Sequence, residues 1–356
     1  MKILHVAETA KGGVGSFLDE LIPLQIERLG EENVRALVPS ENRSQLPSVH
    51  DDCIVTFARP RRSLRALLEL RRELAETVRS YRPDILHLHS TFSGLVGRLR
   101  PRRSASPRII YHPHGWAFEM WQSGWKRSAA ITAERLLANS CFRIVAVSEA
   151  EGAQGLAAGL PPDKLSVVRN GISEHVTLGP PAAWAEERLK VLFVGRLDRQ
   201  KGYDTIRQIA QRNQERMSVR VIGESVAEEG TLRGADSSMD HLGWLSRSEI
   251  YGQMQACDVV AMPSRWEGLA ITALEAMRLA KPLVAFAVGG LPEAIEDGLT
   301  GSLIEPDDIA SFERALLANV NWQQWGLAGQ QRWKHLFTST RMADELFAVY
   351  AQVSAD

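Results

Sequence analysis

Short apolar runs rich in β-branched residues alternate with helical patterns along almost the whole chain, and this alternation restricts the fold more than any other feature. Strands buried on both faces read as continuous apolar runs, and the intervening helices cover the two faces of a parallel sheet. The runs fall at residues 2–8, 34–40, 53–58, 84–90, 108–114, 143–149, 165–171, 190–196, 218–223, 258–264, 282–288 and 301–306. The pattern therefore predicts an α/β protein.

A break in this pattern divides the runs into two sets. No periodicity is visible around Pro180 and Pro181, so we predict a linker over 174–188. The length of 356 residues also suits two domains of roughly 150 residues each. We expect two doubly wound Rossmann-like domains over 1–173 and 189–336, facing each other across a cleft with ligands at the carboxyl ends of the strands.

The last segment, 337–356, is expected to form a helix that packs back on the N-terminal domain. Met342, Leu346, Val349 and Val353 recur at helical spacing and define one apolar stripe. Such a stripe needs a surface to cover it, and a helix at the end of a chain finds one on a neighbouring core.

The composition indicates an ordinary globular protein of a reducing compartment. Apolar residues make up 44% of the chain and charged residues 24%, which excludes collagen-like, disordered and disulfide-scaffold classes. Cys53, Cys141 and Cys257 are odd in number and far apart, which favours the cytosol. The sequence contains no run of about 18 apolar residues, the length that a membrane-spanning helix requires. We predict a cytoplasmic protein whose membrane contact, if it has one, is peripheral on the inner face of the plasma membrane.

A basic segment, residues 59–108, carries 13 basic side chains against 4 acidic ones although the whole chain has a net charge of −1. Within it a helix is expected to carry Arg61, Arg62, Arg65, Arg71, Arg72, Arg79 and Arg82 beside Leu64, Leu67, Leu68, Leu70, Leu74 and Val78. With Trp116, Trp121, Trp125, Lys126 and Arg127 this is typical of a surface that meets anionic lipid. A solvated helix with core leucines explains the pattern as well. No nucleic-acid partner is expected, because recognition modules are absent.

Gly12 and Gly13 belong to a glycine run, 11–16, that follows the first strand and opens a helix. Backbone N–H groups and the helix dipole can hold an anion there. Ser16 stands where a P-loop has its lysine, and the run does not match G-x-G-x-x-G. A nucleoside triphosphatase or a dehydrogenase is therefore poorly supported. A glycine turn without a ligand remains the alternative.

Two strand-to-helix junctions in the second half carry charged residues. Arg196 and Lys201 follow the run at 190–196, where cations can neutralise a diphosphate. Glu267 and Glu275 follow the run at 258–264; if Gly268 opens the helix, its first turn can hold an anion and Glu275 can accept hydrogen bonds from ribose hydroxyls. Solvent-exposed turns and a solvated helix face are the alternatives.

Four histidines occur as the pairs His87 and His89, and His112 and His114, on or after strands. Residues at i and i+2 of a strand point to one face, so each pair could contribute to a metal site. No cysteine or acidic residue is interleaved as a third ligand, and we predict no metal. His114 ends its strand and is expected to donate or accept hydrogen bonds in the cleft, whereas His87 fits a buried position.

Together, the glycine loop at residue 12, VGRLDRQKG, PSRWEGLAITALEAM and KPLVAFAVGGLPEAIEDGLTG resemble the family-4 glycosyltransferases of the GT-B fold in order and spacing. The resemblance implies transfer of a sugar from a nucleotide-sugar, a UDP- or GDP-sugar, with retention of configuration and without a metal or other cofactor. It assigns donor binding to Gly12, Gly13, Arg196, Lys201, Glu267, Gly268, Leu269, Ala270 and Glu275. It assigns catalytic contacts to His114, Glu267, Arg196 and Lys201.

With the basic surface, the resemblance implies a saccharide or lipid-linked acceptor in bacterial surface-polysaccharide assembly. The segment 224–229 departs from the glycine-proline turn that the family usually has near the nucleotide, and Ala280 stands where glycine is common. Two alternatives stay open. One is a sugar-nucleotide epimerase or hydrolase on the same fold, and the other is a non-catalytic homologue that binds nucleotide-sugar or lipid.

Overall fold

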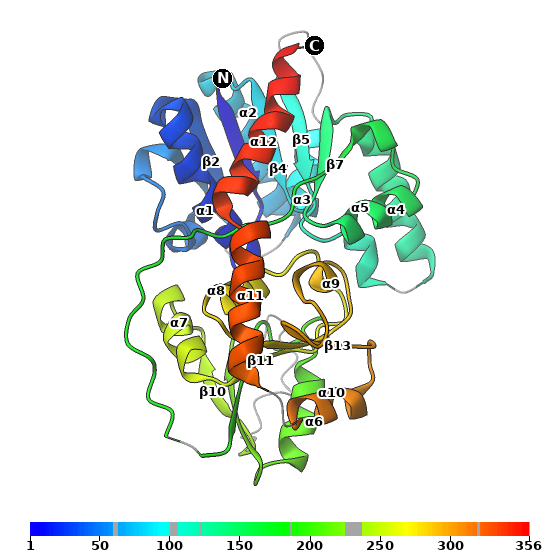
Figure 1. Ribbon diagram of the computed structural model, residues 1–356. Coiled ribbons are helices and arrows are strands. Elements are labelled where there is room, and N and C mark those ends of the chain that lie inside the picture. Colours follow the sequence, from blue (N-terminus) through cyan, green and yellow to red (C-terminus); the bar gives the residue numbers. More distant parts are fainter. Residues whose placement is uncertain are drawn as a thin grey trace. The chain divides into compact units, whose positions relative to one another are not determined.

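The computed structural model describes residues 1–59, 63–99, 106–121, 123–185, 187–224, 237–318 and 321–355, and the chain forms two compact units (Figure 1). Unit 1 comprises Met1–Ser173 and Thr338–Asp356, and unit 2 comprises Glu174–Phe337. Each unit contains one parallel sheet with helices on its faces. The predicted fold class, two doubly wound Rossmann-like units, is confirmed.

The elements of unit 1 are strands β1 (Ile3–Ala7), β2 (Val34–Pro39), β3 (Ile54–Phe57), β4 (Ile85–His89), β5 (Arg108–His112), β6 (Arg143–Ala146) and β7 (Leu165–Val167). Its helices are α1 (Gly13–Leu29), α2 (Leu64–Tyr81), α3 (Thr91–Arg98), α4 (Trp125–Ala138), α5 (Glu149–Ala157) and α12 (Ser339–Ala355). Short 3-10 turns are η1 (Glu31–Asn33), η2 (Ser40–Gln45), η3 (Asp51–Cys53), η4 (Ala117–Met120) and η5 (Pro162–Lys164).

The elements of unit 2 are strands β8 (Leu189–Val194), β9 (Met217–Ile222), β10 (Asp240–Gly243), β11 (Val259–Met262), β12 (Leu283–Phe286) and β13 (Gly301–Ile304). Its helices are α6 (Tyr203–Arg212), α7 (Arg247–Ala256), α8 (Ile271–Arg278), α9 (Leu291–Ala294), α10 (Ile309–Leu316) and α11 (Trp322–Leu336).

The strand order is β3-β2-β1-β4-β5-β6-β7 in the first sheet and β10-β9-β8-β11-β12-β13 in the second. Every apolar run identified in the sequence contains one of these strands. Strand β10 was not predicted, because Asp240–Gly243 lies at a sheet edge, is not fully buried and has no continuous apolar run. An edge strand pairs on one side only, so its sequence carries a weaker signal.

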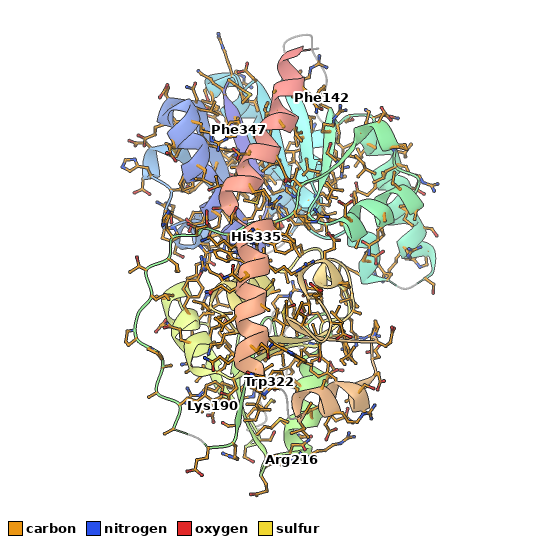
Figure 2. All side chains as sticks on the ribbon, in the orientation of Figure 1. Phe142, Lys190, Arg216, Trp322, His335 and Phe347 are labelled. Carbon is orange, nitrogen blue, oxygen red and sulfur yellow. The ribbon has the colours of Figure 1, made fainter. Side chains whose placement is uncertain are left out.

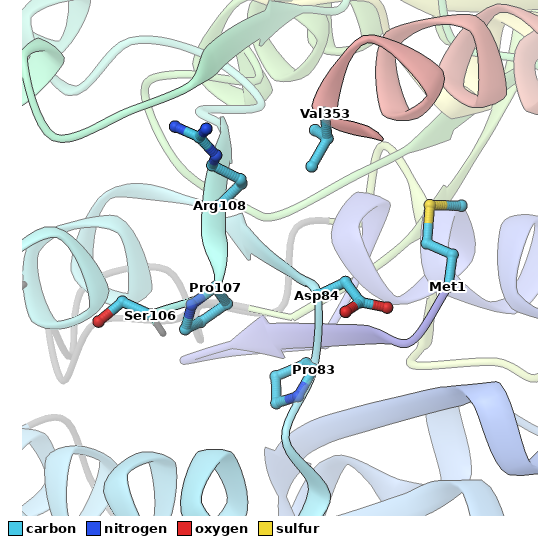
Figure 3. Close-up of a pocket in the computed structure, with 7 residues that line it drawn as sticks. All are labelled: Met1, Pro83, Asp84, Ser106, Pro107, Arg108 and Val353. Carbon is cyan, nitrogen blue, oxygen red and sulfur yellow. The ribbon is translucent and has the colours of Figure 1, made fainter. Parts of the chain in front are cut away.

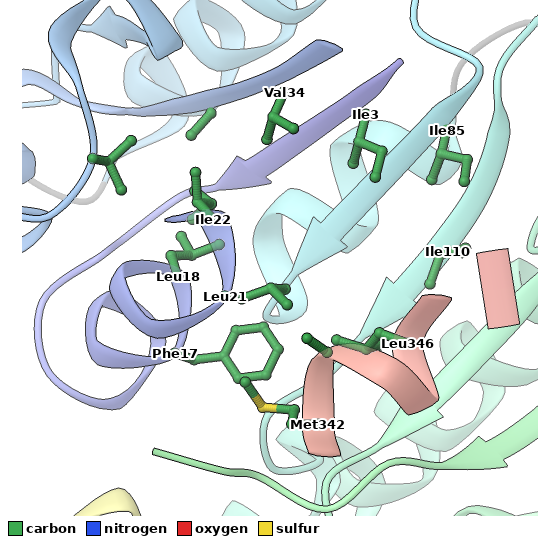
Figure 4. Close-up of a cluster of buried hydrophobic side chains, with 14 of the residues drawn as sticks. Ile3, Phe17, Leu18, Leu21, Ile22, Val34, Ile85, Ile110, Met342 and Leu346 are labelled. Carbon is green, nitrogen blue, oxygen red and sulfur yellow. The ribbon is translucent and has the colours of Figure 1, made fainter. Parts of the chain in front are cut away.

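Alternation along the strands gives unit 1 two cores, one on each face of its sheet. In β1, Ile3 and Ala7 face the core under α1 and α12, whereas Leu4 and Val6 face the core under α2. Figure 4 shows the first core, in which Phe17 of α1 and Met342 of α12 pack against strand residues. Side chains fill the space between sheet and helices throughout both units (Figure 2).

The C-terminal helix α12 belongs to unit 1 although the preceding helix α11 belongs to unit 2. A bridge joins Ile172 to Thr338, and the Ser339 N–H donates to the Ile172 carbonyl at 2.9 Å. Met342 and Leu346 of the predicted stripe are fully buried in the core under α1. The last helix therefore supplies a substantial part of the first unit's core.

The segment that we predicted as a linker, 174–188, contains no helix or strand among its described residues and belongs to unit 2. Trp184 anchors it: its indole is buried, donates to Ser218 Oγ at 3.0 Å and lies 4.4 Å from the Arg220 guanidinium. A buried tryptophan whose N–H has a partner is a strong attachment point.

Helix α2 of the basic segment buries one stripe and exposes another. Leu70 and Leu74 lie in the core, while Leu64 and Leu68 are 80% and 64% exposed. The basic positions Arg61 and Arg62 lie outside the described residues. In the parts of the chain that the structure describes, no helix has the length and apolar character needed to cross a membrane.

The grouping of Trp116 with an exposed lipid-facing surface was wrong. Trp116 is 2% exposed, and its Nε1 donates to the Glu151 carbonyl at 2.8 Å. Trp125, by contrast, is 77% exposed. Trp116 follows β5, and its side chain turns into the core under α2 and bonds to α5 through Glu151. Sequence spacing alone does not reveal this direction.

Gly15 should be intolerant of a side chain, because an added Cβ would lie 1.9 Å from the Ala10 carbonyl oxygen. We expect Gly15→Ala to lower the free energy of unfolding by about 1–3 kcal/mol through overpacking. The control is Gly13→Ala, where an added Cβ meets nothing within 4 Å. Urea unfolding of both variants measures the difference, and equal stabilities would contradict this packing argument.

Candidate functional site

In unit 2 the strand order reverses between β8 and β11, which lie side by side. At such a switch point the loops that leave the carboxyl ends of the two strands diverge and open a ligand site. The turn after β8 carries Arg196 and Lys201, and the turn after β11 carries Glu267. The fold thus brings together the two charged junctions that the sequence places 66 residues apart.

Lys201 and Glu267 form an ion pair between Nζ and Oε1 across these two turns. The Lys201 side chain is 23% exposed and that of Glu267 is 7% exposed. Arg196 lies on the same turn as Lys201, and its Nε contacts Asp198 Oδ2 at 2.8 Å. Asp198 Oδ1 also accepts from the Lys201 backbone N–H at 3.0 Å, so one carboxylate orders both cationic positions.

Arg265 and Gln200 tie the same two turns together. The Gln200 side chain donates to the Trp266 carbonyl at 3.2 Å, and the Arg265 N–H donates to the Gln200 carbonyl at 2.8 Å. The Arg265 guanidinium also contacts Asp204 at 2.7 Å and Asp307 at 2.8 Å. These contacts fix the two loops relative to each other. A site that binds a charged ligand needs its side chains held in place in this way.

Glu275 lies inside α8, where Arg247 and Tyr251 of α7 hold it. Its Oε1 accepts from Tyr251 Oη at 3.1 Å and from Arg247 Nε at 3.3 Å. Glu275 is buried rather than on a solvated helix face. Burial raises the pKa of the Tyr251 hydroxyl well above its usual range, so the hydroxyl remains a hydrogen-bond donor.

Helix α8 begins at Ile271 and not at Gly268, which corrects the expected start of the helix. The Gly268 carbonyl accepts from the Gly290 N–H at 2.5 Å, and Ala270 has the extended backbone of a helix cap. Because the Gly268 carbonyl bonds to the α9 loop instead of the next helical turn, Gly268, Leu269 and Ala270 precede the helix. They lie in the turn that connects β11 to α8.

In unit 1 the strand order reverses between β1 and β4. Gly12 follows β1 with a φ of 79°, a left-handed conformation that favours glycine, and caps α1 without a side-chain hydrogen bond. Gly12 and Gly13 each have open space where a Cβ would stand. An approaching group can therefore reach the backbone at this helix N-terminus.

Five histidines of unit 1 gather on the sheet face that α1 and α12 cover. The register pairs His5 of β1 with His87 of β4, and His89 of β4 with His112 of β5. His114 lies two residues beyond His112, has a φ of 54°, and stacks on His112 with ring centroids 4.1 Å apart. The expectation that His87 and His89 share a face, and that His87 is buried, is confirmed.

Hydrogen bonds link three rings of this histidine cluster, those of His5, His89 and His114. His5 Nδ1 lies 3.0 Å from His89 Nε2, and His89 Nδ1 lies 2.9 Å from His114 Nε2. Gln25 of α1 and Tyr350 of α12 extend the path: His5 Nε2 lies 2.7 Å from Gln25 Oε1, and Gln25 Nε2 lies 3.2 Å from Tyr350 Oη. Tyr350 Oη in turn lies 2.8 Å from His87 Nδ1.

Burial keeps all five rings of the histidine cluster neutral. Desolvation lowers the pKa of His5 to about 4 and that of His114 to about 3. The pKa values of His87, His89 and His112 are also lowered well below the usual range, first by burial and then by the neighbouring rings. The cluster is therefore uncharged near neutral pH.

Neutral imidazoles are also what a metal ion requires as ligands, and the cluster offers two sets of three rings. One ring nitrogen from each of His5, His87 and His89, and likewise from His89, His112 and His114, lies within 4.8 Å of the others. His89 belongs to both sets, and its two nitrogens already bond to His5 and His114. Hydrogen bonds account for the approach of His5, His89 and His114, whereas both ring nitrogens of His112 and Nε2 of His87 have no partner among the described residues. The absence of a metal stays a prediction.

Glu151 supports the loop that follows His114. Its carboxylate accepts from the Gly115 N–H and from the Val147 N–H, the latter at 2.6 Å. Burial raises the pKa of Glu151 to about 7, against the lowering effect of those two backbone donors. A buried acid thus holds the backbone directly beside a predicted site residue.

A pocket of unit 1 lies at the end of the sheet where the strands begin, opposite the end that carries Gly12 and His114 (Figure 3). It is lined by Met1, Pro83, Asp84, Ser106, Pro107, Arg108 and Val353. These residues stand at the starts of β1, β4 and β5 or on α12, whereas Gly12 and His114 follow strand ends. The pocket is therefore separate from the predicted site residues.

Sequence reasoning missed several residues of these arrangements, namely His5, Gln25, Glu151, Arg247, Tyr251 and Tyr350. One signal was present: Gln25 is a polar residue in the otherwise apolar stripe of α1. Each of the others has at least one partner that lies between 20 and 325 positions away in the chain, and no local pattern reports such contacts.

Comparisons with known proteins cover almost the whole chain. A model described as "Glycosyl transferases group 1" matches residues 180–321, and a "Glycosyl transferase 4-like domain" model matches residues 12–171. A Klebsiella pneumoniae protein described as an "Uncharacterized 41.2 kDa protein in cps region" is 30% identical over 86% of this chain and 87% of its own length.

Two further similarities extend over nearly the full length. The alpha-maltose-1-phosphate synthase of Mycolicibacterium smegmatis is 28% identical, with 97% of this chain and 96% of that protein covered. The crystal structure of Anabaena Alr3699/HepE in complex with UDP-glucose has a TM-score of 0.79 at 19% identity, covering 99% of this chain and all of that one. That structural likeness shows the fold.

The buried histidines should make the protein unstable in acid. The unfolded chain takes up protons near pH 6.5 and the folded cluster does not, so stability falls as the pH drops below about 6.5. Glu151 acts oppositely, because burial raises its pKa. The folded protein loses stability as the pH rises from the ordinary pKa of a glutamate to the raised value of about 7. Since five histidines oppose one glutamate, we expect the melting temperature to fall between pH 6.5 and 4.

Thermal unfolding followed by circular dichroism across this range tests the expectation. His112→Gln should make the decline shallower, because a buried group that the unfolded chain would protonate is removed. His335→Gln is the matched control, since His335 is exposed on α11 (Figure 2). A melting temperature that stays level or increases on acidification from pH 6.5 to 4 would refute the argument.

Proposed function

The chain belongs to the group 1 glycosyltransferases, and we propose that it transfers a sugar from a nucleotide-sugar to a saccharide or lipid-linked saccharide, with retention of configuration and without a metal ion. The observation that carries the proposal for this site is the Lys201–Glu267 ion pair at the switch point between β8 and β11. It sets a cation and a carboxylate side by side where a doubly wound sheet receives its ligand.

The chemistry at this edge suits a diphosphate leaving group. When the bond from the sugar to the diphosphate breaks, negative charge develops on the phosphate oxygens, and preorganised cations stabilise it. Lys201 and Arg196 supply those cations, and their present partners Glu267 and Asp198 hold them in place before the donor binds. Glu267 then accepts hydrogen bonds from hydroxyls of the donor sugar.

Glu275 is proposed to bind the ribose of the nucleotide. Within the described ranges both of its hydrogen bonds fall on Oε1, so Oε2 is left to accept from ribose hydroxyls. The backbone of Gly268, Leu269 and Ala270 precedes α8 and is proposed to contact sugar or phosphate. In unit 1, Gly12, Gly13 and His114 are proposed as further donor contacts.

The arrangement supports a front-face reaction without a covalent intermediate. The acceptor hydroxyl attacks the sugar carbon on the side from which the diphosphate leaves, and its proton passes to the departing phosphate oxygen. The Glu267 carboxylate bonds to Lys201 through Oε1, and its proposed role is to accept hydrogen bonds and not to attack as a nucleophile.

UDP- or GDP-sugars are the proposed donors. The solved neighbour in complex with UDP-glucose favours the first of these. Of the unusual segment 224–229, only Glu224 lies within the described residues, where its carbonyl accepts from the Leu197 N–H at 3.1 Å. Glu224 therefore contacts the same turn that carries Arg196.

Surface-polysaccharide assembly at the cytoplasmic face of the membrane is the proposed setting. The relative from a cps region supports it, and so does the exposure of Leu64 and Leu68 between arginines on α2. Lipid-linked acceptors lie at a membrane surface, and a basic helix with exposed leucines is suited to contact anionic lipid there.

Donor binding should depend on the charged residues of unit 2. We expect calorimetric titration of the protein with UDP-, GDP- and ADP-sugars to show binding of one nucleotide class. A chelator in the buffer removes metal ions, so binding is measured without them. Lys201→Ala and Arg196→Ala should each weaken that binding by about 10- to 100-fold, the worth of a hydrogen bond to a charged group. Turnover by Lys201→Ala or Glu267→Ala should fall by at least about 100-fold.

Lys334→Ala, an exposed lysine on α11 of the same unit, is the matched control and should behave like the parent protein. The anomeric configuration of the product, read by NMR, tests retention. Unchanged turnover in both Lys201→Ala and Glu267→Ala would overturn the site, and a requirement for added metal would overturn metal independence.

Membrane contact can be measured separately by flotation with liposomes. We expect the protein to float with vesicles that contain anionic lipid and to remain unbound with neutral vesicles, because the arginines of α2 attract anionic headgroups. Leu64→Ser combined with Leu68→Ser should reduce flotation without unfolding, since both side chains are exposed. Failure to float with either vesicle would remove the membrane proposal.

A further inference from the structure

One hydrogen-bonded path runs through unit 1 from the C-terminal helix to His114. It passes from Tyr350 of α12 to Gln25 of α1, then to His5 of β1, His89 of β4 and His114 after β5. Its members come from two helices, two strands and the loop after β5, and all but His114 are buried. A neutral imidazole has one donor and one acceptor nitrogen, so along such a path each ring sets the tautomer of the next.

The distances around Gln25 give the path its direction. The 2.7 Å contact suits a His5 Nε2–H that donates to the amide oxygen, and the 3.2 Å contact suits an amide N–H that donates to Tyr350 Oη. The reversed amide would need the Tyr350 hydroxyl to donate over 3.2 Å, beyond the usual 2.5–3.0 Å of an O–H···O bond. It would also press an amide nitrogen to 2.7 Å from an imidazole nitrogen.

The Tyr350 end agrees with this direction. Its hydroxyl accepts from Gln25 and is then free to donate to His87 Nδ1, 2.8 Å away. A phenol hydroxyl is a better donor than a neutral imidazole N–H, and an imidazole nitrogen is a better acceptor than a phenol oxygen. The pairing in which tyrosine donates to histidine is therefore the stronger one.

The direction propagates ring by ring. Since His5 donates through Nε2, its Nδ1 must accept, and His89 Nε2 donates to it over 3.0 Å. His89 Nδ1 must then accept, and His114 Nε2 donates to it over 2.9 Å. His114 is left with a proton on Nε2 and a bare lone pair on Nδ1.

We propose that Gln25 and Tyr350 are positioning residues that hold His114 as its Nε2–H tautomer and direct the Nδ1 lone pair to accept a hydrogen bond from a substrate hydroxyl. The inference rests on the proposed function, in which His114 contacts the donor sugar. It specifies that contact: His114 is an acceptor for a hydroxyl and not a donor to a phosphate or carbonyl oxygen.

The surroundings of His114 suit this role. The ring is partly exposed, while His112 stacks on one side at an interplanar angle of 11° and Phe17 meets it edge-on with centroids 4.8 Å apart. These contacts hold the plane of the ring, and the hydrogen bond to His89 sets its rotation. The lowered pKa of His114 keeps the lone pair unprotonated at neutral pH.

Nitrogen NMR of the full-length protein with labelled histidine side chains reports the tautomer directly. We expect His114 to show a protonated Nε2 and an unprotonated Nδ1. A dominant Nδ1–H form would overturn the assigned direction, and so would a metal-bound pattern at any ring of the cluster. This measurement needs no substrate and no turnover.

Two variants interrupt the path at its start. Gln25→Met removes the oxygen that accepts from His5, and Tyr350→Phe removes the hydroxyl that orients the Gln25 amide. Both substitutions keep the side-chain volume nearly constant. If Gln25→Met does not fold, Tyr350→Phe, which loses only one hydroxyl, still tests the proposal. We expect mixed His114 tautomers in both, whereas an unchanged His114 pattern in both would sink the proposal.

Tyr111→Phe is the matched control. Tyr111 is also buried, and its hydroxyl donates to Glu134 at 3.2 Å, but it faces the core on the other side of the sheet. This variant should retain the parental His114 tautomer and the parental donor kinetics. A comparable change in Tyr111→Phe would show that any lost buried hydroxyl disturbs the cluster.

Kinetics then connect the tautomer to the reaction. We expect Tyr350→Phe to lower kcat/KM for the donor by up to about tenfold, the worth of one misdirected hydrogen bond. Mixed tautomers with unaltered kcat/KM would overturn the role of His114 as an acceptor while leaving sugar transfer established. A protein with the expected tautomer but no transfer activity would instead overturn the proposed function.

Discussion

The reversal of strand order beside the first strand of each sheet is the constraint on which the geometry of the candidate site depends. In unit 2 it places the turns after β8 and β11 together, and Lys201 meets Glu267 there. In unit 1 it places the glycine turn after β1 beside the end of β4. Parallel strands direct all their carboxyl ends to one edge, so charged residues far apart in the chain converge without any local sequence relation.

Unit 1 adds a second constraint, a set of neutral imidazoles inside a hydrophobic core. A buried polar group is tolerated when it has a hydrogen-bond partner, and His5, His89 and His114 partner one another. Gln25 and Tyr350 complete the arrangement from the two helices that cover that face of the sheet. Core packing and the proposed recognition of the donor sugar thus depend on the same side chains.

The fold was largely predictable and the contacts of the site only partly so. Continuous apolar runs predicted every strand except the edge strand β10, because burial on both faces selects such sequences. The junctions carrying Arg196, Lys201 and Glu267 were recognisable from their position after strands. The support of Glu275 by Tyr251 was not, since it depends on how α7 packs against α8.

The sequence by itself determined the α/β class, the two sets of strands and the loops that carry charge, because these follow from periodicity and from short-range turn chemistry. The tertiary structure alone decided that Trp116 is a core residue, that α8 begins at Ile271, and that Tyr350 reaches the histidine cluster. Each of those outcomes depends on a contact between segments distant in the chain, and local residue patterns do not encode which distant partner a side chain meets.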